Sequence, residues 1–218
     1  MFTELQRLVN NDKRDFLSYK DFDWSNATDV DLLCFGKGFT QEGIAVTERG
    51  AFLDALKYMG TKKFTYLETG LCEGSSVKTA LGWALKNNGA DISSMELKLL
   101  PKFEEMMTKI GLVDKVTILK GDSQKLPWDK KIDFLFLDSE HALSNVLGEY
   151  MKFRLYLKEG TGIVGFHDAS LRGVKLAIDI IQNIDCLELI SECVDNSVYG
   201  IRFFKLKYRN LEQSKYTL

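Results

Sequence analysis

Short apolar runs alternate with stretches of helical periodicity along most of the chain. The apolar runs have the length and composition of strands buried in a parallel sheet, and they fall at Phe64–Glu68, Ile92–Met95, Val116–Leu119, Ile132–Leu137 and Ile163–Phe166. Apolar residues recur at helical spacing over Ser75–Lys86, Leu99–Ile110, Leu143–Leu157 and Val174–Ile184. This alternation predicts an open, doubly wound α/β sheet, because a closed barrel of this kind needs eight strand–helix units.

The two ends of the chain differ from this regular middle part. A helix that Thr47 caps and Gly60 ends precedes the first strand, while Leu187–Cys193 and Val198–Leu206 predict a C-terminal antiparallel hairpin. The predicted fold is therefore Rossmann-like, with a mostly parallel, seven-stranded, doubly wound sheet and helices on both faces. The chain divides into a cap or lid segment, a main domain and a loose polar tail, at residues 1–46, 47–206 and 207–218.

Composition and charge narrow the class of protein. The chain has 218 residues, 45% of them hydrophobic, and its 29 basic and 31 acidic residues give a net charge of −2. It has no long basic block and no apolar run of membrane-spanning length, so neither a nucleic acid nor a membrane is the expected partner. The four cysteines form no CxxC pair, which argues against a zinc ribbon. Because the N-terminus lacks the apolar core of a secretory signal, we expect a cytoplasmic location.

Glycines and polar residues follow the first three predicted strands, at the edge where parallel sheets bind ligands. Gly70 allows a tight turn after the first strand, and Gly74 and Ser75 open a helix with free N–H groups. The spacing is GxxxG rather than the GxGxxG of dinucleotide enzymes, and the preceding Glu68 suits an amino group better than a pyrophosphate. Glu96 ends the second strand, where an acid can accept both hydroxyls of a ribose. The third strand ends in short polar side chains able to read an adenine edge, at Asp122, Ser123 and Gln124. Each acid alone is also typical of a solvated loop, so the prediction depends on their shared position at strand ends.

The two histidines of the chain each follow a core strand. His141 comes shortly after the fourth strand, in Asp138-Ser139-Glu140-His141, and His167 ends the fifth strand before Asp168. A single histidine is more often a structural side chain. Two at the ligand-binding edge favour proton transfer or metal binding.

Four motifs in order carry a family resemblance. The runs YLETGLCEGSS, SSMEL, DKVTILKGDSQKL and IDFLFLDSEHA together resemble the class I S-adenosylmethionine-dependent methyltransferases. The likeness is to the small-molecule O-methyltransferase branch, which includes catechol O-methyltransferase and the sugar and macrolide O-methyltransferases, and it covers roughly residues 36–168.

This resemblance implies roles for the strand-end residues. Glu68, Gly70 and Ser75 would surround the methionine part of the cofactor together with Gly74, and Glu96 would hold its ribose. The adenine would be bordered by Asp122, Ser123 and Gln124, with Asp138 on the same side of the pocket. Lys37 and Gly38 resemble the glycine-containing lid segment that lies over the methyl group in that branch.

The resemblance also implies a metal site and a general base. Metal-using members carry an acid after the fourth strand and two oxygen ligands after the fifth, and these hold a magnesium ion that chelates two substrate oxygens. Asp138, His167 and Asp168 stand at those positions. The imidazole of His167 departs from the family pattern and makes manganese, iron or zinc conceivable besides magnesium. The catechol-type general base is a lysine three residues after the first ligand, and His141 stands there.

The sequence thus predicts an S-adenosylmethionine-dependent O-methyltransferase acting on a small hydroxylated metabolite such as a sugar, polyketide or phenol, with His141, His167 and Asp138 as catalytic residues. Two alternatives stay open, an NAD-dependent oxidoreductase and a non-catalytic cofactor-binding module on the same fold. The missing GxGxxG argues against the oxidoreductase. The hairpin and residues 1–46 are candidate surfaces for a homodimer.

Overall fold

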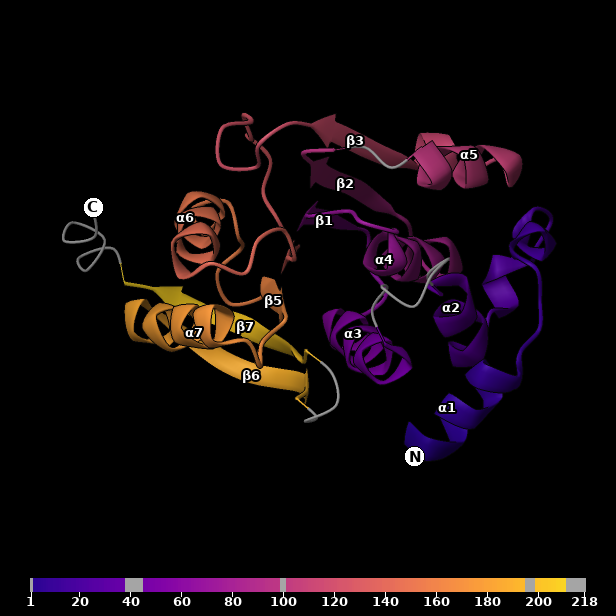
Figure 1. Ribbon diagram of the computed structural model, residues 1–218, viewed down its shortest axis with the longest axis horizontal. Coiled ribbons are helices and arrows are strands. Elements are labelled where there is room, and N and C mark those ends of the chain that lie inside the picture. The colour runs from indigo at the N-terminus through magenta and orange to yellow at the C-terminus, as the bar shows by residue number, and fades with distance from the viewer. Residues whose placement is uncertain (1, 38–44, 99–100, 195–198, 211–218) are drawn as a thin grey trace.

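The computed structural model describes residues 2–37, 45–98, 101–194 and 199–210 (Figure 1). Its centre is a seven-stranded sheet in the order β3-β2-β1-β4-β5-β7-β6, in which β7 runs opposite to the other six strands. The strands are β1 (Phe64–Thr69), β2 (Ala90–Glu96), β3 (Val116–Lys120), β4 (Phe134–Leu137), β5 (Ile163–His167), β6 (Asp185–Cys193) and β7 (Ile201–Arg209). The Rossmann-like sheet with a C-terminal hairpin, predicted from the sequence, is confirmed.

Helices cover both faces of this sheet. The helices are α1 (Phe2–Asn11), α2 (Asp29–Phe35), α3 (Val46–Met59), α4 (Ser75–Lys86), α5 (Pro101–Lys109), α6 (Leu143–Phe153) and α7 (Arg172–Ile184), with 3-10 turns at Phe16–Tyr19, Trp24–Asn26 and Val113–Lys115. Figure 1 shows α6 and α7 on one face and α3 and α4 on the other, with α1 and α2 outside α4. None of the described helices is long and apolar enough to cross a membrane.

Alternate residues of a strand pack on opposite faces of the sheet. In β4, Phe134 and Phe136 pack in the cluster with α3 and α4, whereas Leu135 and Leu137 pack in the cluster with α6 and α7. Both faces are therefore apolar, which explains why the strands read as unbroken hydrophobic runs rather than as alternating patterns.

The order in which the chain adds strands to the sheet reverses between β1 and β4. The chain goes from β1 outward to β2 and β3 on one side, and then returns to β4 and continues to β5 on the other side. Parallel pairing brings the carboxyl ends of these strands to one edge, where the backbone N–H of Asp138 donates to the carbonyl of Thr69 at 2.9 Å. Ligands of doubly wound sheets bind at such a switch point.

Several predicted boundaries are corrected by tertiary contacts. Strand β4 starts at Phe134 because Ile132 makes only an isolated bridge to Leu157, and α6 ends at Phe153, four residues before its predicted end. Strand β7 extends three residues past Leu206, so Lys207–Arg209 belong to the sheet and not to a loose tail.

The start of α3 also differs from the prediction. Its N-cap is Ala45 rather than Thr47, and the carboxylate of Glu48 accepts the backbone N–H of Ala45 at 3.0 Å. The first part of the predicted helix Leu99–Ile110 lies outside the described residues, which begin again at Pro101.

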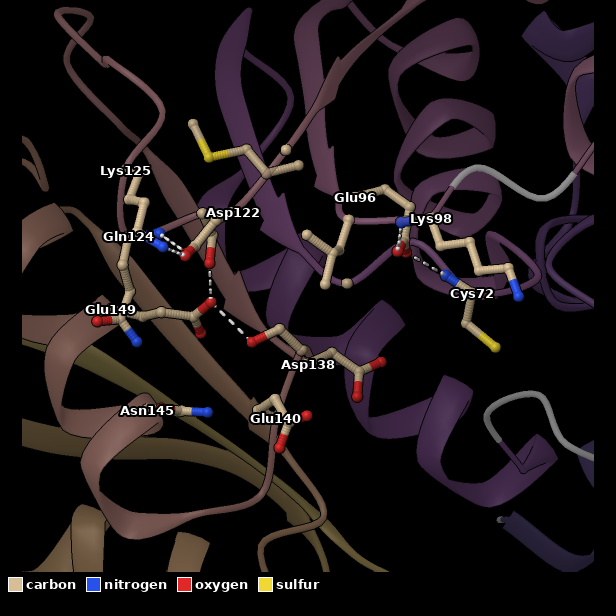
Figure 2. A pocket seen from close by; sticks show the side chains of 16 residues that line it. Cys72, Glu96, Lys98, Asp122, Gln124, Lys125, Asp138, Glu140, Asn145 and Glu149 are labelled. Carbon is tan, nitrogen blue, oxygen red and sulfur yellow. Dashed lines mark hydrogen bonds and ion pairs between the residues drawn. The ribbon is translucent and has the colours of Figure 1, made fainter.

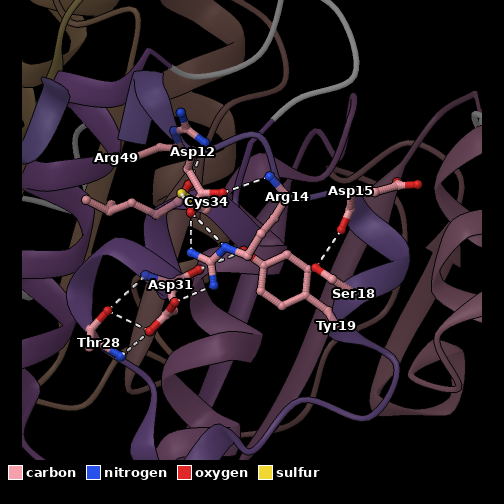
Figure 3. Close-up of polar contacts among 10 residues, drawn as sticks. Asp12, Arg14, Asp15, Ser18, Tyr19, Thr28, Asp31, Cys34 and Arg49 are labelled. Carbon is pink, nitrogen blue, oxygen red and sulfur yellow. Dashed lines mark hydrogen bonds and ion pairs between the residues drawn. The ribbon is translucent and has the colours of Figure 1, made fainter. Parts of the chain in front are cut away.

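Residues 2–37 contain more regular structure than the sequence predicts. Arg14 pairs with both Asp12 and Asp31, and Asp31 completes a capping box with Thr28 at the start of α2 (Figure 3). The rings of Phe16 and Phe35 stack, as do those of Tyr19 and Trp24, and the ring of Trp24 meets that of Phe35 edge-on. This part of the predicted cap is therefore a packed helical layer against α3 and α4.

Candidate active site

A pocket of about 880 Å³ opens at the carboxyl ends of β1 to β4 (Figure 2). Six of the residues predicted to hold a cofactor line it: Gly70, Glu96, Asp122, Ser123, Gln124 and Asp138. The pocket thus gathers residues from four strand ends that lie up to 68 residues apart in the sequence (138 − 70).

Two glycines shape the turn after β1. Gly70 has φ +86°, and a Cβ there would overlap the carbonyl oxygen of Asp138, so only glycine lets the ends of β1 and β4 meet this closely. Gly74 has φ +68° at the start of α4, where a Cβ would overlap the ring of Phe103. The neighbouring Ser75 is buried, and its Oγ has no hydrogen-bond partner within the described part of the chain.

Glu68 lies beneath the pocket instead of lining it. Its side chain is fully buried, accepts a hydrogen bond from the hydroxyl of Tyr66 and lies 3.5 Å from Oγ of Ser94. Burial raises the pKa of Glu68 well above its usual value. In this structure Glu68 contacts residues of β1 and β2 and does not line the pocket.

Glu96 holds the loop after β1 from the end of β2. Its Oε2 accepts the backbone N–H groups of Leu71 at 2.8 Å and Cys72 at 3.2 Å, and its Oε1 accepts that of Lys98 at 3.0 Å (Figure 2). A carboxylate has about four acceptor positions. Since three of these positions on Glu96 accept backbone N–H groups, one position is left for a ligand hydroxyl.

A buried acid on α6 organises the far side of the pocket. Glu149 is 2% exposed and accepts hydrogen bonds from the hydroxyls of Thr69 at 2.9 Å and Ser139 at 2.7 Å, and from that of Ser123. Burial raises the pKa of Glu149, although the three hydroxyl donors oppose this shift. Asp122 beside it accepts the backbone N–H of Gln124 at 2.9 Å.

The two histidines and three acids form a connected cluster next to this pocket. Nδ1 of His167 lies 2.8 Å from Oδ1 of Asp138 and 3.2 Å from Oδ2 of Asp168, and its Nε2 lies 3.5 Å from Oε2 of Glu48. Nε2 of His141 lies 2.6 Å from Oδ2 of Asp168. Asp168 has φ +54°, an unusual conformation for a residue other than glycine and one that clusters at functional sites.

His167 balances the negative charge of the acids around it. Burial opposes the charge on His167, but its contacts with Asp138, Asp168 and Glu48 outweigh burial and hold the pKa of His167 well above its usual value. Burial raises the pKa of Asp138 despite the contact with His167. Burial also opposes the charge of Asp168, yet the hydrogen bond to His167 leaves the pKa of Asp168 below its usual value.

The spacing of three of these side chains fits a small divalent cation. Ligand atoms of Asp138, His167 and Asp168 all lie within 4.8 Å of one another. Bonds of about 2.1 Å at right angles to one ion would place neighbouring ligand atoms about 3.0 Å apart. The 2.8 and 3.2 Å separations around Nδ1 of His167 bracket that value.

The central part of the chain is similar to known proteins. The family model described as a methyltransferase domain matches residues 67–169. This region is similar to a methyltransferase domain. It contains every pocket residue named above, together with both histidines. A search of curated proteins finds no match for the chain.

Solved structures share the fold of the methyltransferase domain at low identity. A proposed O-methyltransferase from Klebsiella pneumoniae has a TM-score of 0.63 at 15% identity, over 94% of this chain and 97% of the other. An O-methyltransferase from Bacillus cereus in complex with SAH has a TM-score of 0.59 at 12% identity, over 94% and 100%. The O-methyltransferase TomG from Streptomyces achromogenes, involved in tomaymycin synthesis and solved in complex with SAM, has a TM-score of 0.56 at 13% identity, over 76% and 82%. The resemblance to class I S-adenosylmethionine-dependent methyltransferases is confirmed.

Sequence reasoning missed two acids that contact residues of the candidate site. Glu48 contacts His167 across 119 residues, and Glu149 contacts Thr69 across 80 residues. Both stand on helices, where an acid in the sequence is typical of a solvated face, so no local signal could reveal them.

The predicted lid residues are only partly described. The carbonyl of Lys37 accepts a hydrogen bond from Nζ of the buried Lys78 at 2.7 Å, which fixes the end of the packed helical layer to α4. Gly38 lies outside the described residues.

Proposed function

We propose that this protein transfers the methyl group of S-adenosylmethionine to a hydroxyl group of a small molecule. The observation that carries the proposal is the cluster of His141, Asp168, His167 and Asp138, which shares Asp138 with the strand-end pocket. The methyltransferase family match and the fold shared with O-methyltransferases that bind SAM or SAH support it.

The pocket suits an adenosyl cofactor along its length. Glu96 is oriented by three backbone N–H groups and would accept a ribose hydroxyl, while Asp122, Ser123 and Gln124 would border the adenine. The methionine part would then lie at the turn after Gly70. The sulfonium methyl group would then point toward Asp138 and the histidine cluster.

His141 would act as the general base. If its Nε2–H donates to Asp168, its Nδ1 carries the lone pair and is free to accept a proton. The substrate oxygen attacks the methyl carbon, the carbon–sulfur bond breaks with its electrons going to sulfur, and the hydroxyl proton passes to Nδ1 of His141. His141 has half of its side chain exposed, so a substrate hydroxyl can reach it. The remaining task of the protein is to align donor and acceptor.

Asp138, His167 and Asp168 would hold a divalent cation such as Mg²⁺ or Mn²⁺. When bound, the cation would lower the pKa of a substrate hydroxyl beside it. The carboxylate of Glu48 faces the other nitrogen of His167, and an outer carboxylate of this kind fixes the orientation of a ligating imidazole.

The first experiment is calorimetric titration of S-adenosylmethionine and, separately, NAD, with and without Mg²⁺ or Mn²⁺. We expect binding of S-adenosylmethionine that is lost in Glu96→Ala, and no binding of NAD. Binding of NAD alone, or of neither ligand, would refute the proposal.

Turnover then tests the base. Transfer from labelled S-adenosylmethionine is screened over sugars, catechols and polyketide phenols. On the best acceptor, His141→Ala should lower turnover at least about 100-fold, the usual contribution of a general base, with cofactor affinity unchanged. The matched control is Lys175→Ala, an exposed residue on α7 that does not line the pocket. An unchanged rate in His141→Ala removes His141 from the mechanism.

The homodimer through β6, β7 and the segment 1–46 remains a prediction, and sedimentation equilibrium would test it.

A further inference from the structure

Glu149 joins three separate segments of the pocket wall. Its Oε2 accepts from Thr69 at the end of β1, and its Oε1 accepts from Ser123 after β3 and Ser139 after β4. Figure 2 shows Glu149 reaching from α6 toward these loops. Ser123, Ser139 and Glu149 itself all line the pocket.

The charge of Glu149 is met by hydroxyl groups and not by a basic side chain. Within the described ranges no lysine, arginine or histidine forms an ion pair with Glu149. Lys152, three residues further along α6, instead donates to the carbonyl oxygens of Ser123 at 2.5 Å and Leu126. Helix α6 therefore contacts the loop after β3 in two ways. Lys152 binds the backbone carbonyls of the loop, and Glu149 binds the hydroxyl of Ser123.

This arrangement fixes the direction of the hydroxyl hydrogen bonds. An ionised carboxylate only accepts hydrogen bonds, so each hydroxyl that contacts Glu149 must use its single O–H as the donor. Ser123 and Ser139 then have only lone pairs left for a ligand. The part of the pocket that they line is an acceptor surface.

We propose that Glu149 is a positioning residue that makes Ser123 and Ser139 acceptors toward the cofactor base, and that the pocket thereby selects a 6-amino purine over a 6-oxo purine. This inference rests on the proposed function, which places the adenine beside Ser123. The amino group of adenine is a hydrogen-bond donor and matches the two serine oxygens. The carbonyl of hypoxanthine presents lone pairs to the same oxygens and leaves them without a donor.

The experiment compares two ligands that differ at position 6 of the purine, where a carbonyl replaces the amino group, and at the adjacent N1, which gains a hydrogen. S-adenosylhomocysteine and its deaminated analogue, S-inosylhomocysteine, are titrated calorimetrically into the full-length protein. We expect the wild type to bind the adenosyl compound at least about tenfold more tightly, since a mismatched buried hydrogen bond costs about that factor. Glu149→Gln supplies an amide that can donate to the serines and so allows their hydrogens to turn toward the ligand. Its preference should fall to within about threefold.

Asp185, a buried acid at the start of β6 that contacts α6 away from the pocket, gives the matched control. Asp185 is 2% exposed, accepts from the hydroxyl of Tyr150 at 2.6 Å and from Nε of Arg154 at 2.7 Å, and does not line the pocket. Asp185→Asn should lower the unfolding midpoint as Glu149→Gln does, but it should leave the ligand preference unchanged. Ser139→Ala provides a second variant that keeps Glu149, and it should also reduce the preference.

The outcomes separate this inference from the proposed function. A wild-type preference that persists in both Glu149→Gln and Ser139→Ala overturns the role of Glu149, while the proposed function stands. Equal binding of the two ligands by the wild type also overturns the inference alone. Binding of neither ligand overturns the proposed function and this inference with it.

Discussion

Replacing Gly70 with alanine tests whether the meeting of β1 and β4 sets the pocket. In the native structure Gly70 has φ +86°, and an added Cβ would lie 2.6 Å from the carbonyl carbon of Asp138 and 2.8 Å from Cα of Ser139. These are backbone atoms at the end of a central strand, so they cannot rotate away as a flexible side chain would. Because Gly70 and Asp138 both line the pocket, their separation changes its width.

The structure gives the size of the effect. Ordinary contact begins at 3.4 Å, so the distance to the carbonyl carbon of Asp138 must grow by about 0.8 Å (3.4 − 2.6). The left-handed conformation costs an alanine about 1–2 kcal/mol, and overpacking of a tight site adds about 1–3 kcal/mol. We therefore expect Gly70→Ala to lose about 2–5 kcal/mol of unfolding free energy. A shift of this size at the site should weaken cofactor binding at least about tenfold.

The assay pairs urea unfolding with calorimetric titration of S-adenosylmethionine. Gly160→Ala is the matched control, because Gly160 has φ +75° but an added Cβ there meets nothing within 4 Å. It should lose only the conformational cost of about 1–2 kcal/mol and keep its cofactor affinity. Equal losses of stability in the two variants, with unchanged affinity in both, would refute the reasoning.

Two further predictions concern buried groups outside the pocket wall. Burial, with repulsion from Arg49, lowers the pKa of Lys78 from 10.5 to about 7. Above pH 7 the unfolded chain therefore binds more protons at this residue than the folded chain does, and the unfolding free energy should rise with pH, by about 2 kcal/mol between pH 7 and 9. Glu48→Ala removes the carboxylate that faces His167, and Mn²⁺ binding measured by electron paramagnetic resonance should weaken about tenfold or more.

Their controls are chosen from the same elements. Lys78→Met should flatten the rise of the unfolding free energy with pH. Lys86→Met, at a half-buried position on the same helix, should leave this rise unchanged. An unchanged slope in Lys78→Met would contradict the assignment of the pH dependence to Lys78. For the metal, Asp138→Ala should abolish Mn²⁺ binding and Glu48→Gln should lie between wild type and Glu48→Ala. Wild-type affinity in Glu48→Ala would show that the carboxylate does not orient His167.

Local sequence was sufficient to find the parallel strands of the sheet and one half of the site. A strand buried on both faces needs a short continuous apolar run, so Phe134–Leu137 is visible in the sequence without any knowledge of its neighbours. Residues that directly follow such strands, among them Gly70, Glu96 and Asp138, come to one edge in any parallel sheet, which is why they could be predicted to line a common pocket.

Tertiary structure alone decided what reaches this edge from the helices. Glu48 and Glu149 are ordinary helical acids by sequence, and they become site residues only because α3 and α6 pack with those positions facing the strand ends. Glu68 shows the opposite case. The sequence motif predicts that it contacts the cofactor, but in the folded protein its side chain is fully buried against Tyr66. Periodicity records which face of an element is buried, whereas contacts across 80 or 119 residues depend on how the layers fit together.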